Sequence, residues 1–466
     1  MRYQQRLLLF LCAYFVALTS QPIFAESGIR AGAAKRSIVP SFPTHMGGFF
    51  DRNQPFEGVH DDLYVRAVVL ENDATTIVMI GSDLMALDAE LTHMVRQDIT
   101  AATQIPASHV LLCAAHNHSA PSYYQKQGEA EIKAEPSLRT FLRKQFTDAV
   151  LEAHTRRVPA RVGFASGQIQ GLTRNRQQRN NEVIDPQVGV LRIEERDERR
   201  TIATVFNFTG HPVVLGSSNL LLSGEFPGAA SRAVESLLGG VAVFTQGACG
   251  DVTVNRSGDP FHEIERIGRT LAGEVIKTSG LITCATEVLL SAASRTVRLE
   301  GRPVLSVTEA ETALSRSTTS IEEAKARGLS QSSMQLLEDK HRVLTAAARR
   351  ARAIADDPSK KEDQLDAEVQ VIEVGDAAFV AVPGELFVEY ALELRARIRQ
   401  EFQMSTCLVG YANGYIGYIV TPRAMETGGY EASSTRVDVL AGRTLVEAAM
   451  SLAYEVGPRL EPAQKH

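Results

Sequence analysis

Tryptophan is absent from this chain of 466 residues, and cysteine, excess positive charge and long apolar runs are scarce. The five cysteines are too few and too scattered to hold a chain of this length together, which excludes a disulfide-stapled scaffold. The formal net charge of −6 argues against nucleic acid as a partner. No segment reaches the ~20 apolar residues that a membrane span needs. The chain must therefore fold around an ordinary apolar core.

The N-terminus has the pattern of a secretory signal peptide. Arg2 and Arg6 precede the apolar residues 7–18, and residues 23–25 offer a cleavage point before Glu26. We therefore expect residues 1–25 to be removed and the mature chain, residues 26–466, to be secreted or periplasmic.

Short β-rich runs alternate with helical patterns along most of the chain. Strands are predicted at 65–70, 76–81, 110–115, 203–208, 241–244, 368–374 and 377–382, and helices at 89–103, 137–156 and 386–402. Several of these strands are apolar on both faces. Such alternation predicts an α/β fold, a layered domain with a mixed β-sheet and flanking helices.

Residues 307–355 differ from the rest of the chain. They are charged and alanine-rich, with apolar residues at helical spacing and a break near residues 328–330. This pattern predicts an inserted helical hairpin that packs on the surface of the main domain.

The motif His116-Asn117-His118 comes directly after the apolar run 110–115. On an extended backbone, side chains two residues apart point to the same face, so both imidazoles can serve one metal ion or one substrate. The polar, proline-containing residues 119–122 end the strand. The pair is therefore predicted at a strand end, where binding residues on rigid scaffolds gather.

Other polar residues follow strands in the same way, namely His211, Asp251 and Glu385. Each comes directly after a glycine, which permits unusual backbone angles and close approach of a ligand. Each also has a structural alternative. His211 can be a buried, hydrogen-bonded histidine, Asp251 can close a turn, and Glu385 can favour the positive end of the next helix.

Taken together, these stretches resemble the catalytic domain of the neutral, non-lysosomal ceramidase family. The resemblance covers nearly all of residues 26–466 and rests on motifs that occur in the family's order. These motifs lie at 46–48, 57–61, 115–119, 175–176, 207–211, 223–224, 250–252, 382–385, 415–421 and 430–435.

The resemblance implies a zinc cofactor, Zn²⁺, with ligands at His116, His211, Glu385 and Tyr418. Imidazoles and carboxylates are ordinary zinc ligands, whereas the phenol of Tyr418 is assigned on resemblance alone. The same resemblance places the catalytic residues His118, Arg176 and Tyr430 near the scissile amide. Its implied substrate is ceramide or a related N-acyl amide lipid, which connects the chain to sphingolipid metabolism and to transient contact with a membrane surface.

The expected chemistry follows from charge. An amide carbonyl is a poor electrophile, and zinc both polarises it and lowers the pKa of a bound water to about 7. Hydrolysis then creates an oxyanion, for which His118, Arg176 and Tyr430 are candidate stabilisers. A proton must also reach the leaving amine, and His118 is the simplest donor.

The chain departs from the family in two places. The family's catalytic serine is replaced by Thr253, whose hydroxyl remains but carries an extra methyl group. The family's C-terminal immunoglobulin-like domain is not expected here, because the sequence stops at His466, soon after a helix predicted at 437–454.

The sequence therefore predicts an exported zinc amide hydrolase of the ceramidase type. Three alternatives stay open: the same architecture acting on another amide, an ester or a lactone; a silent protein that binds lipids or glycans; and a metallo-β-lactamase-like enzyme. The last is disfavoured because no Asp-His follows the histidine pair. The oligomeric state is not predicted.

Overall fold

The structure is a computed structural model that describes residues 28–49, 52, 54–122, 125–127, 130–132, 136–177 and 183–457. The expected signal peptide lies outside the described residues. No helix in these ranges is long and apolar enough to cross a membrane.

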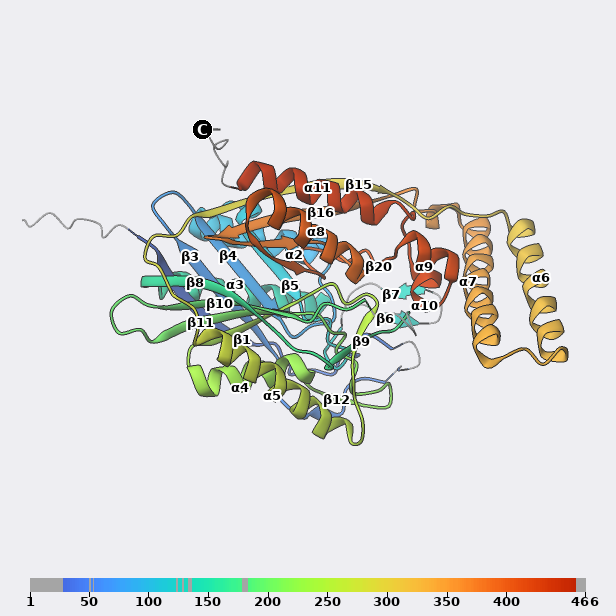
Figure 1. Cartoon of the computed structure of the whole chain (residues 1–466), viewed down its shortest axis with the longest axis horizontal. Helices are drawn as coiled ribbons and strands as arrows, with labels where there is room; N and C mark the ends of the chain where they lie inside the picture. Colours follow the sequence, from blue (N-terminus) through green and yellow to red (C-terminus); the bar gives the residue numbers. More distant parts are fainter. Residues whose placement is uncertain are drawn as a thin grey trace, which may run out of the picture.

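A large mixed sheet runs through the centre of the molecule (Figure 1). In spatial order its strands are β13 (Val241–Gln246), β11 (Thr201–Phe208), β10 (Gln187–Glu195), β8 (Val158–Gln168), β1 (Arg30–Ser37), β3 (Tyr64–Glu71), β4 (Thr76–Ser82) and β5 (Val110–Ala114). The pairs β11–β13 and β4–β5 are parallel, and the remaining neighbours are antiparallel.

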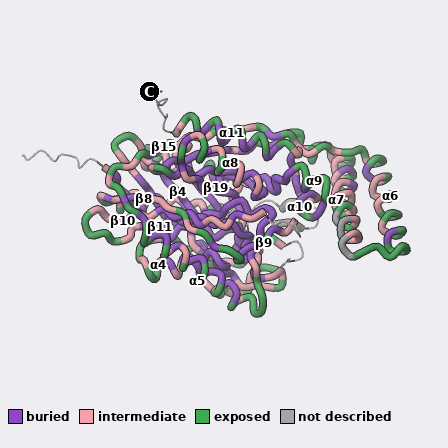
Figure 2. The backbone as a smooth tube through the Cα atoms, in the orientation of Figure 1, coloured by how far each residue is buried: buried purple, intermediate pink, exposed green. Residues whose placement is uncertain are grey.

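A second, smaller sheet packs against one face of the first. Its strands, in spatial order, are β15 (Leu290–Glu300), β16 (Gln364–Val374), β17 (Ala377–Ala381) and β19 (Ser405–Val409). One apolar cluster joins the two sheets, with Leu111 and Val205 on the first sheet and Phe379 on the second. Figure 2 shows this interior as the most continuously buried part of the chain.

Helices cover the outer faces of both sheets. α2 (Ala89–Thr103), α3 (Pro136–Thr155), α4 (Glu225–Leu238) and α5 (Pro260–Ser279) pack on the large sheet, and α8 (Val388–Phe402) and α11 (Ala441–Val456) pack on the small one. Strands of the large sheet therefore face apolar layers on both sides, which explains their lack of polar alternation. The predicted α/β fold with a layered mixed sheet and flanking helices is confirmed.

The expected helical hairpin is present as α6 (Val307–Ala326) and α7 (Gln331–Asp356), which project from one end of the molecule (Figure 1). α6 begins with a capping box, in which Ser306 and Glu309 satisfy each other's backbone N–H groups. Between α6 and α7 the buried apolar cluster consists of Ala310, Ala348 and Ala351. The hairpin therefore has a thin core.

Short elements complete the chain around the ends of the two sheets. They are β2 (Gly58–Val59), β6 (Gln125–Gln127), β7 (Ala130–Ile132), β9 (Thr173–Asn175), β12 (Leu221–Leu222), β14 (Val252–Val254), β18 (Glu385–Leu386), β20 (Tyr418–Ile419), α9 (Pro422–Thr427) and α10 (Tyr430–Ser434). The last helix, predicted at 437–454, is α11 and begins four residues later than expected.

Candidate metal centre and active site

The candidate site lies where strands of both sheets end. His116 and His211 follow β5 and β11 of the large sheet. Glu385 and Tyr418 come from loops that follow β17 and β19 of the small sheet, and they are joined in register by the parallel pair β18–β20. Residues more than 250 positions apart in the sequence therefore meet at one end of the sandwich.

The backbone at the histidine motif is not the extended strand that the sequence predicts. β5 ends at Ala114, and His116 has a φ of 63°, in the left-handed region that a β-carbon disfavours. His116 and His118 still meet, with 3.2 Å between their Nε2 atoms. The prediction that the imidazoles converge is right, but a turn brings them together rather than strand alternation.

Asn117, between the two histidines, fastens this turn to the rest of the fold. Its side-chain amide donates to the carbonyl oxygens of Asp83 (3.2 Å) and Ser223 (2.6 Å). Its side-chain oxygen accepts from the N–H of Ser119 at 2.8 Å. A fully buried amide with these partners holds the turn in place and offsets the cost of its backbone conformation.

Three imidazoles form a buried cluster with the geometry of a metal site. The Nε2 atoms of His116 and His211 are 3.0 Å apart, and one ligand nitrogen from each of His116, His118 and His211 lies within 4.8 Å of the others. Zinc bound tetrahedrally at about 2.05 Å holds its nitrogen ligands roughly 3.3 Å apart. The observed spacings fit such an ion.

Hydrogen bonds on the far side of two rings support this fit. Nδ1 of His116 lies 3.0 Å from the carbonyl oxygen of Met85, and Nδ1 of His211 lies 3.1 Å from that of Cys249. A carbonyl oxygen only accepts, so each Nδ1 carries the proton and each Nε2 presents a lone pair. Two lone pairs facing each other at 3.0 Å repel unless a cation lies between them. Burial also lowers the pKa of His211, which favours the neutral, ligating form.

His118 differs from the other two histidines. Its Nδ1 is buried and has no hydrogen-bond partner among the described residues. Gly48, with a φ of 97°, passes so close that a β-carbon there would lie 2.2 Å from Nδ1 of His118. The backbone carbonyl of His118 accepts a hydrogen bond from Arg52 at 2.6 Å. Within the described chain, the ring of His118 thus lacks the hydrogen bond to a backbone carbonyl that orients the rings of His116 and His211.

Glu385 supplies a carboxylate to the cluster, with Oε2 at 3.4 Å from Nε2 of His116. The hydroxyl of Tyr415 donates to Oε1 at 2.5 Å, and that of Tyr411 donates to Oε2 at 3.3 Å. Burial works against the charge, but positive charge at His116, from a proton or a bound cation, acts with Tyr415 and Arg176 to hold the pKa of Glu385 below its ordinary value. The carboxylate is therefore ionised and oriented.

Sequence reasoning missed Tyr411 and Tyr415. The ring of Tyr411 stacks on that of His116 with 4.0 Å between centroids, and its hydroxyl also contacts Sγ of Cys249 at 3.1 Å. Tyr411 thus contacts ligand candidates from both sheets. The spacing of tyrosines at 411, 415 and 418 was the sequence signal that could have identified them as site residues.

Arg176 and Tyr418 form the cationic side of the site. Arg176 pairs with Glu431 at 3.0 Å and shares a hydrogen bond with the phenol of Tyr418. Burial disfavours the charge of Arg176, yet Tyr418 and Glu431 keep its pKa above the ordinary value. Burial and Glu385 raise the pKa of Tyr418 well above that of a free phenol. The ring of Tyr430 lies 5.7 Å from that of Tyr418, edge to face.

Thr253 lies beside the cluster rather than in its opening. It belongs to β14, opposite Arg174 of β9, and a parallel backbone bridge joins it to His211. Neighbouring Asp251 accepts hydrogen bonds from Asn175 (2.6 Å) and from the N–H of Val388 (2.9 Å), and burial raises its pKa to about 7. Asp251 thus ties loops of both sheets together.

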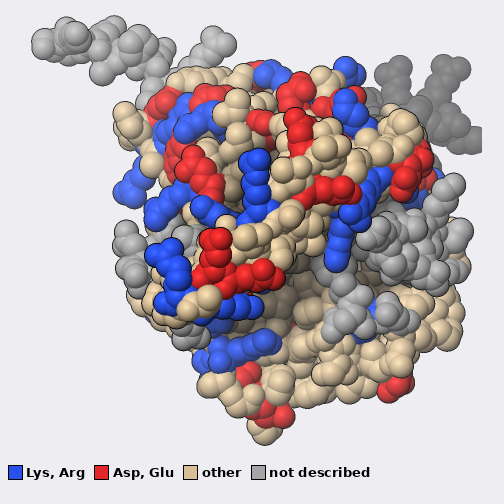
Figure 3. Space-filling view, turned by 90° about the vertical axis from the view of Figure 1, so that its right-hand side faces the viewer, with Lys and Arg blue, Asp and Glu red and all other residues tan. Residues whose placement is uncertain are grey.

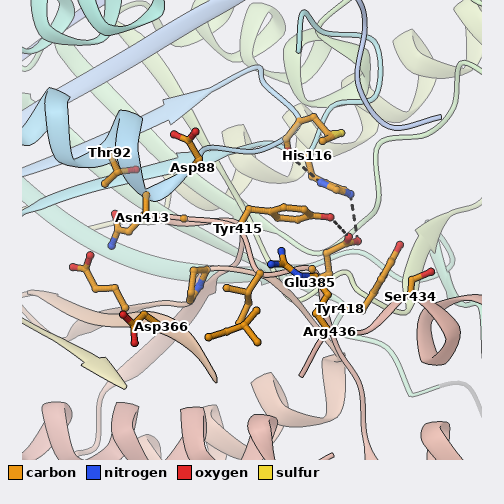
Figure 4. Close-up of a pocket in the computed structure, with 18 of the residues that line it drawn as sticks. Asp88, Thr92, His116, Asp366, Glu385, Asn413, Tyr415, Tyr418, Ser434 and Arg436 are labelled. Carbon is orange, nitrogen blue, oxygen red and sulfur yellow. Dashed lines mark hydrogen bonds and ion pairs between the residues drawn. The ribbon is translucent and has the colours of Figure 1, made fainter. Parts of the chain in front are cut away.

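A cavity of about 1130 Å³ opens onto the site (Figure 4). His116, His118, Glu385, Tyr415, Tyr418 and Tyr430 line it, whereas Arg176, His211, Thr253 and Tyr411 are not among its described lining residues. Apolar walls come from Met46, Phe49, Met85, Leu365 and Ile416. Phe49 contacts His118 edge to face, with 5.0 Å between ring centroids. The cavity is large enough for a drug-sized molecule and combines apolar walls with convergent polar groups.

The fold and the site together define a class of protein. It is a layered α/β sandwich with a buried cluster of histidines and a glutamate at its strand ends. The sequence model described as "Neutral/alkaline non-lysosomal ceramidase, N-terminal" matches residues 32–267, more than half of the chain. The chain belongs to this family.

Curated relatives agree with this assignment. A neutral ceramidase of Mycobacterium tuberculosis is 23% identical over 483 aligned positions, which cover 88% of this chain and 74% of the relative. Neutral ceramidase A of Dictyostelium discoideum is 27% identical over 252 positions, covering 47% of this chain and 35% of the relative. The second match therefore spans about a third of the Dictyostelium protein.

Solved structures match the fold as a whole. The neutral ceramidase of Pseudomonas aeruginosa superposes with a TM-score of 0.73 at 20% identity, covering 95% of this chain and 77% of that structure. A ceramidase complexed with C2 gives a TM-score of 0.72 at 17% identity, covering 95% and 78%. At these identities the similarity shows a shared fold.

Proposed function

We propose that this chain is a zinc-dependent hydrolase that cleaves the amide of ceramide, or of a related N-acyl lipid, into a fatty acid and an amine. One observation carries the proposal: imidazoles with lone pairs facing one another meet an ionised glutamate at a cavity with apolar walls. Membership of the ceramidase family supports the reaction class.

The residues divide into holding and reacting groups. His116, His211, Glu385 and Tyr418 would hold the ion, which when bound would polarise the amide carbonyl and lower the pKa of a water ligand. The backbone bonds to Met85 and Cys249 fix the two imidazoles, and the phenols of Tyr411 and Tyr415 fix the carboxylate. These contacts orient the ligands before substrate arrives.

His118 and Arg176 are assigned to the reacting amide. Arg176 lies against the phenol of Tyr418 and provides a permanent positive charge for the developing oxyanion. His118 contacts the cavity wall through Phe49 and has an Nδ1 without a backbone partner, which leaves its ring available for proton transfer to the leaving amine. Tyr430, beside Tyr418, completes this group. Thr253 serves as a shape-defining neighbour of His211 rather than as a nucleophile.

We assign this activity to residues 26–466 as one catalytic unit, and we assign residues 1–25 to export on the strength of the sequence pattern. A zinc hydrolase of the same architecture acting on a different amide, an ester or a lactone is the second candidate. Polar residues, among them Asp88 and Thr92, line the cavity beside its apolar walls. This mixed lining supports the second candidate.

Metal analysis combined with product identification tests the proposal. The purified protein should contain one zinc per chain and release a free fatty acid and an amine from at least one member of a panel of N-acyl amides, as detected by mass spectrometry. Chelation should abolish the reaction, and added zinc should restore it. Hydrolysis that persists in metal-free protein would overturn the assignment, and turnover of esters or lactones alone would favour the second candidate.

A further inference from the structure

A small cavity lies between the hairpin and α10, next to the candidate active site. Its volume is about 200 Å³, and three arginines line it: Arg302, Arg350 of α7 and Arg436. Hydroxyl-bearing residues complete the wall, namely Ser433, Ser434 and Thr435. Figure 3 looks at this end of the molecule, where basic and acidic side chains are mixed on the surface. The charged residues that line the cavity beneath them, as far as the structure describes it, are all arginines.

Two of the three arginines carry charge that no carboxylate within 4 Å neutralises, as far as the structure describes the chain. Arg436 pairs with Glu362. Within the described chain, the side chain of Arg302 donates only to the carbonyl oxygens of Ala432 (2.9 Å) and Ser433 (3.3 Å). Nη2 of Arg350 is buried and has no hydrogen-bond partner in the described chain. Burying a guanidinium nitrogen without a partner is costly, and neither guanidinium has a carboxylate of the described chain beside it, so this arrangement favours an anion.

The electrostatics agree with this geometry. Burial lowers the pKa of Arg302, and the positive charge of Arg350 lowers it further. Burial likewise lowers the pKa of Arg350, and Arg436 adds to the effect, although Glu362 opposes it. Phosphate, sulfonate and carboxylate groups match the planar fork of arginine and accept several hydrogen bonds at once. An oxyanion held between Arg302 and Arg350 would relieve their mutual repulsion.

This cavity adjoins the catalytic one. Ser434 and Arg436 line both, and the hydroxyl of Ser434 is hydrogen-bonded to the phenol of Tyr430. In Figure 4, Ser434 and Arg436 lie beyond Glu385 and Tyr418 as seen from His116. The apolar residues Phe49 and Met85 lie on the histidine side, in contact with His118 and His116 respectively. The two ends of the site therefore differ in chemistry.

We propose that Arg302 and Arg350 form an anion subsite that selects N-acyl amides whose amine half carries a phosphate, sulfonate or carboxylate group. The proposal rests on the proposed hydrolase function. The acyl chain lies toward Phe49 and Met85, the scissile amide lies at the metal centre, and the anionic group lies between the hairpin and α10.

The test compares substrates that share one acyl chain: N-lauroyl taurine, N-lauroyl ethanolamine phosphate and neutral N-lauroyl ethanolamine. The ratio of kcat/KM for an anionic substrate to that for the neutral one is measured in the full chain and in Arg302→Gln and Arg350→Gln. Loss of a charge-assisted hydrogen bond should lower this ratio roughly 10-fold or more in either variant. Arg316→Gln, an exposed change on α6 that lines none of these cavities, is the matched control and should leave the ratio unchanged.

A second measurement does not depend on turnover. Inorganic phosphate should raise the melting temperature of the full chain and of the Arg316→Gln control, and should raise it less in Arg350→Gln. If no amide is hydrolysed but phosphate still stabilises through Arg350, the proposed function fails while the anion site stands. Phosphate stabilisation without any preference for anionic amides identifies a site for a free anion and overturns the substrate assignment. Equal losses on anionic and neutral substrates, with phosphate stabilisation unchanged, would show that the arginines only hold the hairpin in place.

Discussion

The two halves of the candidate metal centre are anchored by different means. The histidine half comes from the large sheet, where backbone carbonyls of Met85 and Cys249 hold His116 and His211. The other half comes from the small sheet, where the side-chain hydroxyls of Tyr411 and Tyr415 hold Glu385. No substitution removes a backbone carbonyl, whereas a phenol can be deleted. A substitution outside the candidate ligands can therefore delete a hydrogen bond to the ligand side chain itself on the glutamate side, but not on the histidine side.

The largest expected effect is loss of the metal after removal of an imidazole. His211→Ala deletes one ligand of a buried cluster, so the protein should purify largely without zinc and lose activity by roughly 10³-fold or more. Elemental analysis of the purified variant measures the loss. His262→Ala, at an exposed position of α5, is the control and should keep full occupancy. Full zinc occupancy in both His211→Ala and His116→Ala would remove these residues from the ligand set.

A separate effect is expected from the groups assigned to the reacting amide. His118→Ala and Arg176→Ala should retain zinc but lose about 10²-fold in kcat, the scale for removing one oxyanion-stabilising donor. Zinc content and steady-state kinetics on the same preparations separate binding from chemistry. Metal loss in His118→Ala would instead make His118 a ligand, as its place in the three-histidine cluster allows.

The comparison between the two halves is sharpest at the tyrosines. Tyr415→Phe removes the 2.5 Å hydrogen bond to Glu385 without changing the ring, so zinc affinity should fall about 10-fold to 100-fold. Competition with a chelator of known affinity measures the change. Tyr454→Phe, at a largely exposed position of α11, provides the matched control. Unchanged affinity in Tyr415→Phe would mean that the hydroxyl of Tyr415 does not position Glu385.

The smallest effect is expected at Thr253. Thr253→Ser should remain active. Thr253→Val, which keeps the volume but deletes the hydroxyl, should lower turnover only several-fold, because we assign Thr253 a role in shape and hydrogen bonding rather than as a nucleophile. Steady-state kinetics with zinc content as the control measure this. An acyl group trapped on Thr253 by rapid quench, together with an inactive but zinc-loaded Thr253→Val, would establish covalent catalysis instead.

Sequence patterns predicted the layers of the fold because several of its strands are apolar runs, such as β3 and β11. They also predicted that His116, His211 and Glu385 follow strands. They did not predict the left-handed turn at His116, because its stability comes from Asn117 contacting distant loops. Nor did they predict the β18–β20 pair, since strands of two residues carry no periodicity. Tertiary contacts decide both features.

The thin core of the α6–α7 hairpin has a consequence for local unfolding. Among the residues whose burial is described, only alanines are fully buried between its helices. We therefore expect the hairpin to open without disturbing either sheet, so that its amide hydrogens exchange well before those of β10 and β11. Arg350 belongs to this hairpin, whereas Ser434 belongs to α10, beside the catalytic cavity. An anion that bridges the hairpin and α10 would therefore slow amide exchange throughout α7. The opening rate of the hairpin would in turn set how fast such an anion binds and dissociates.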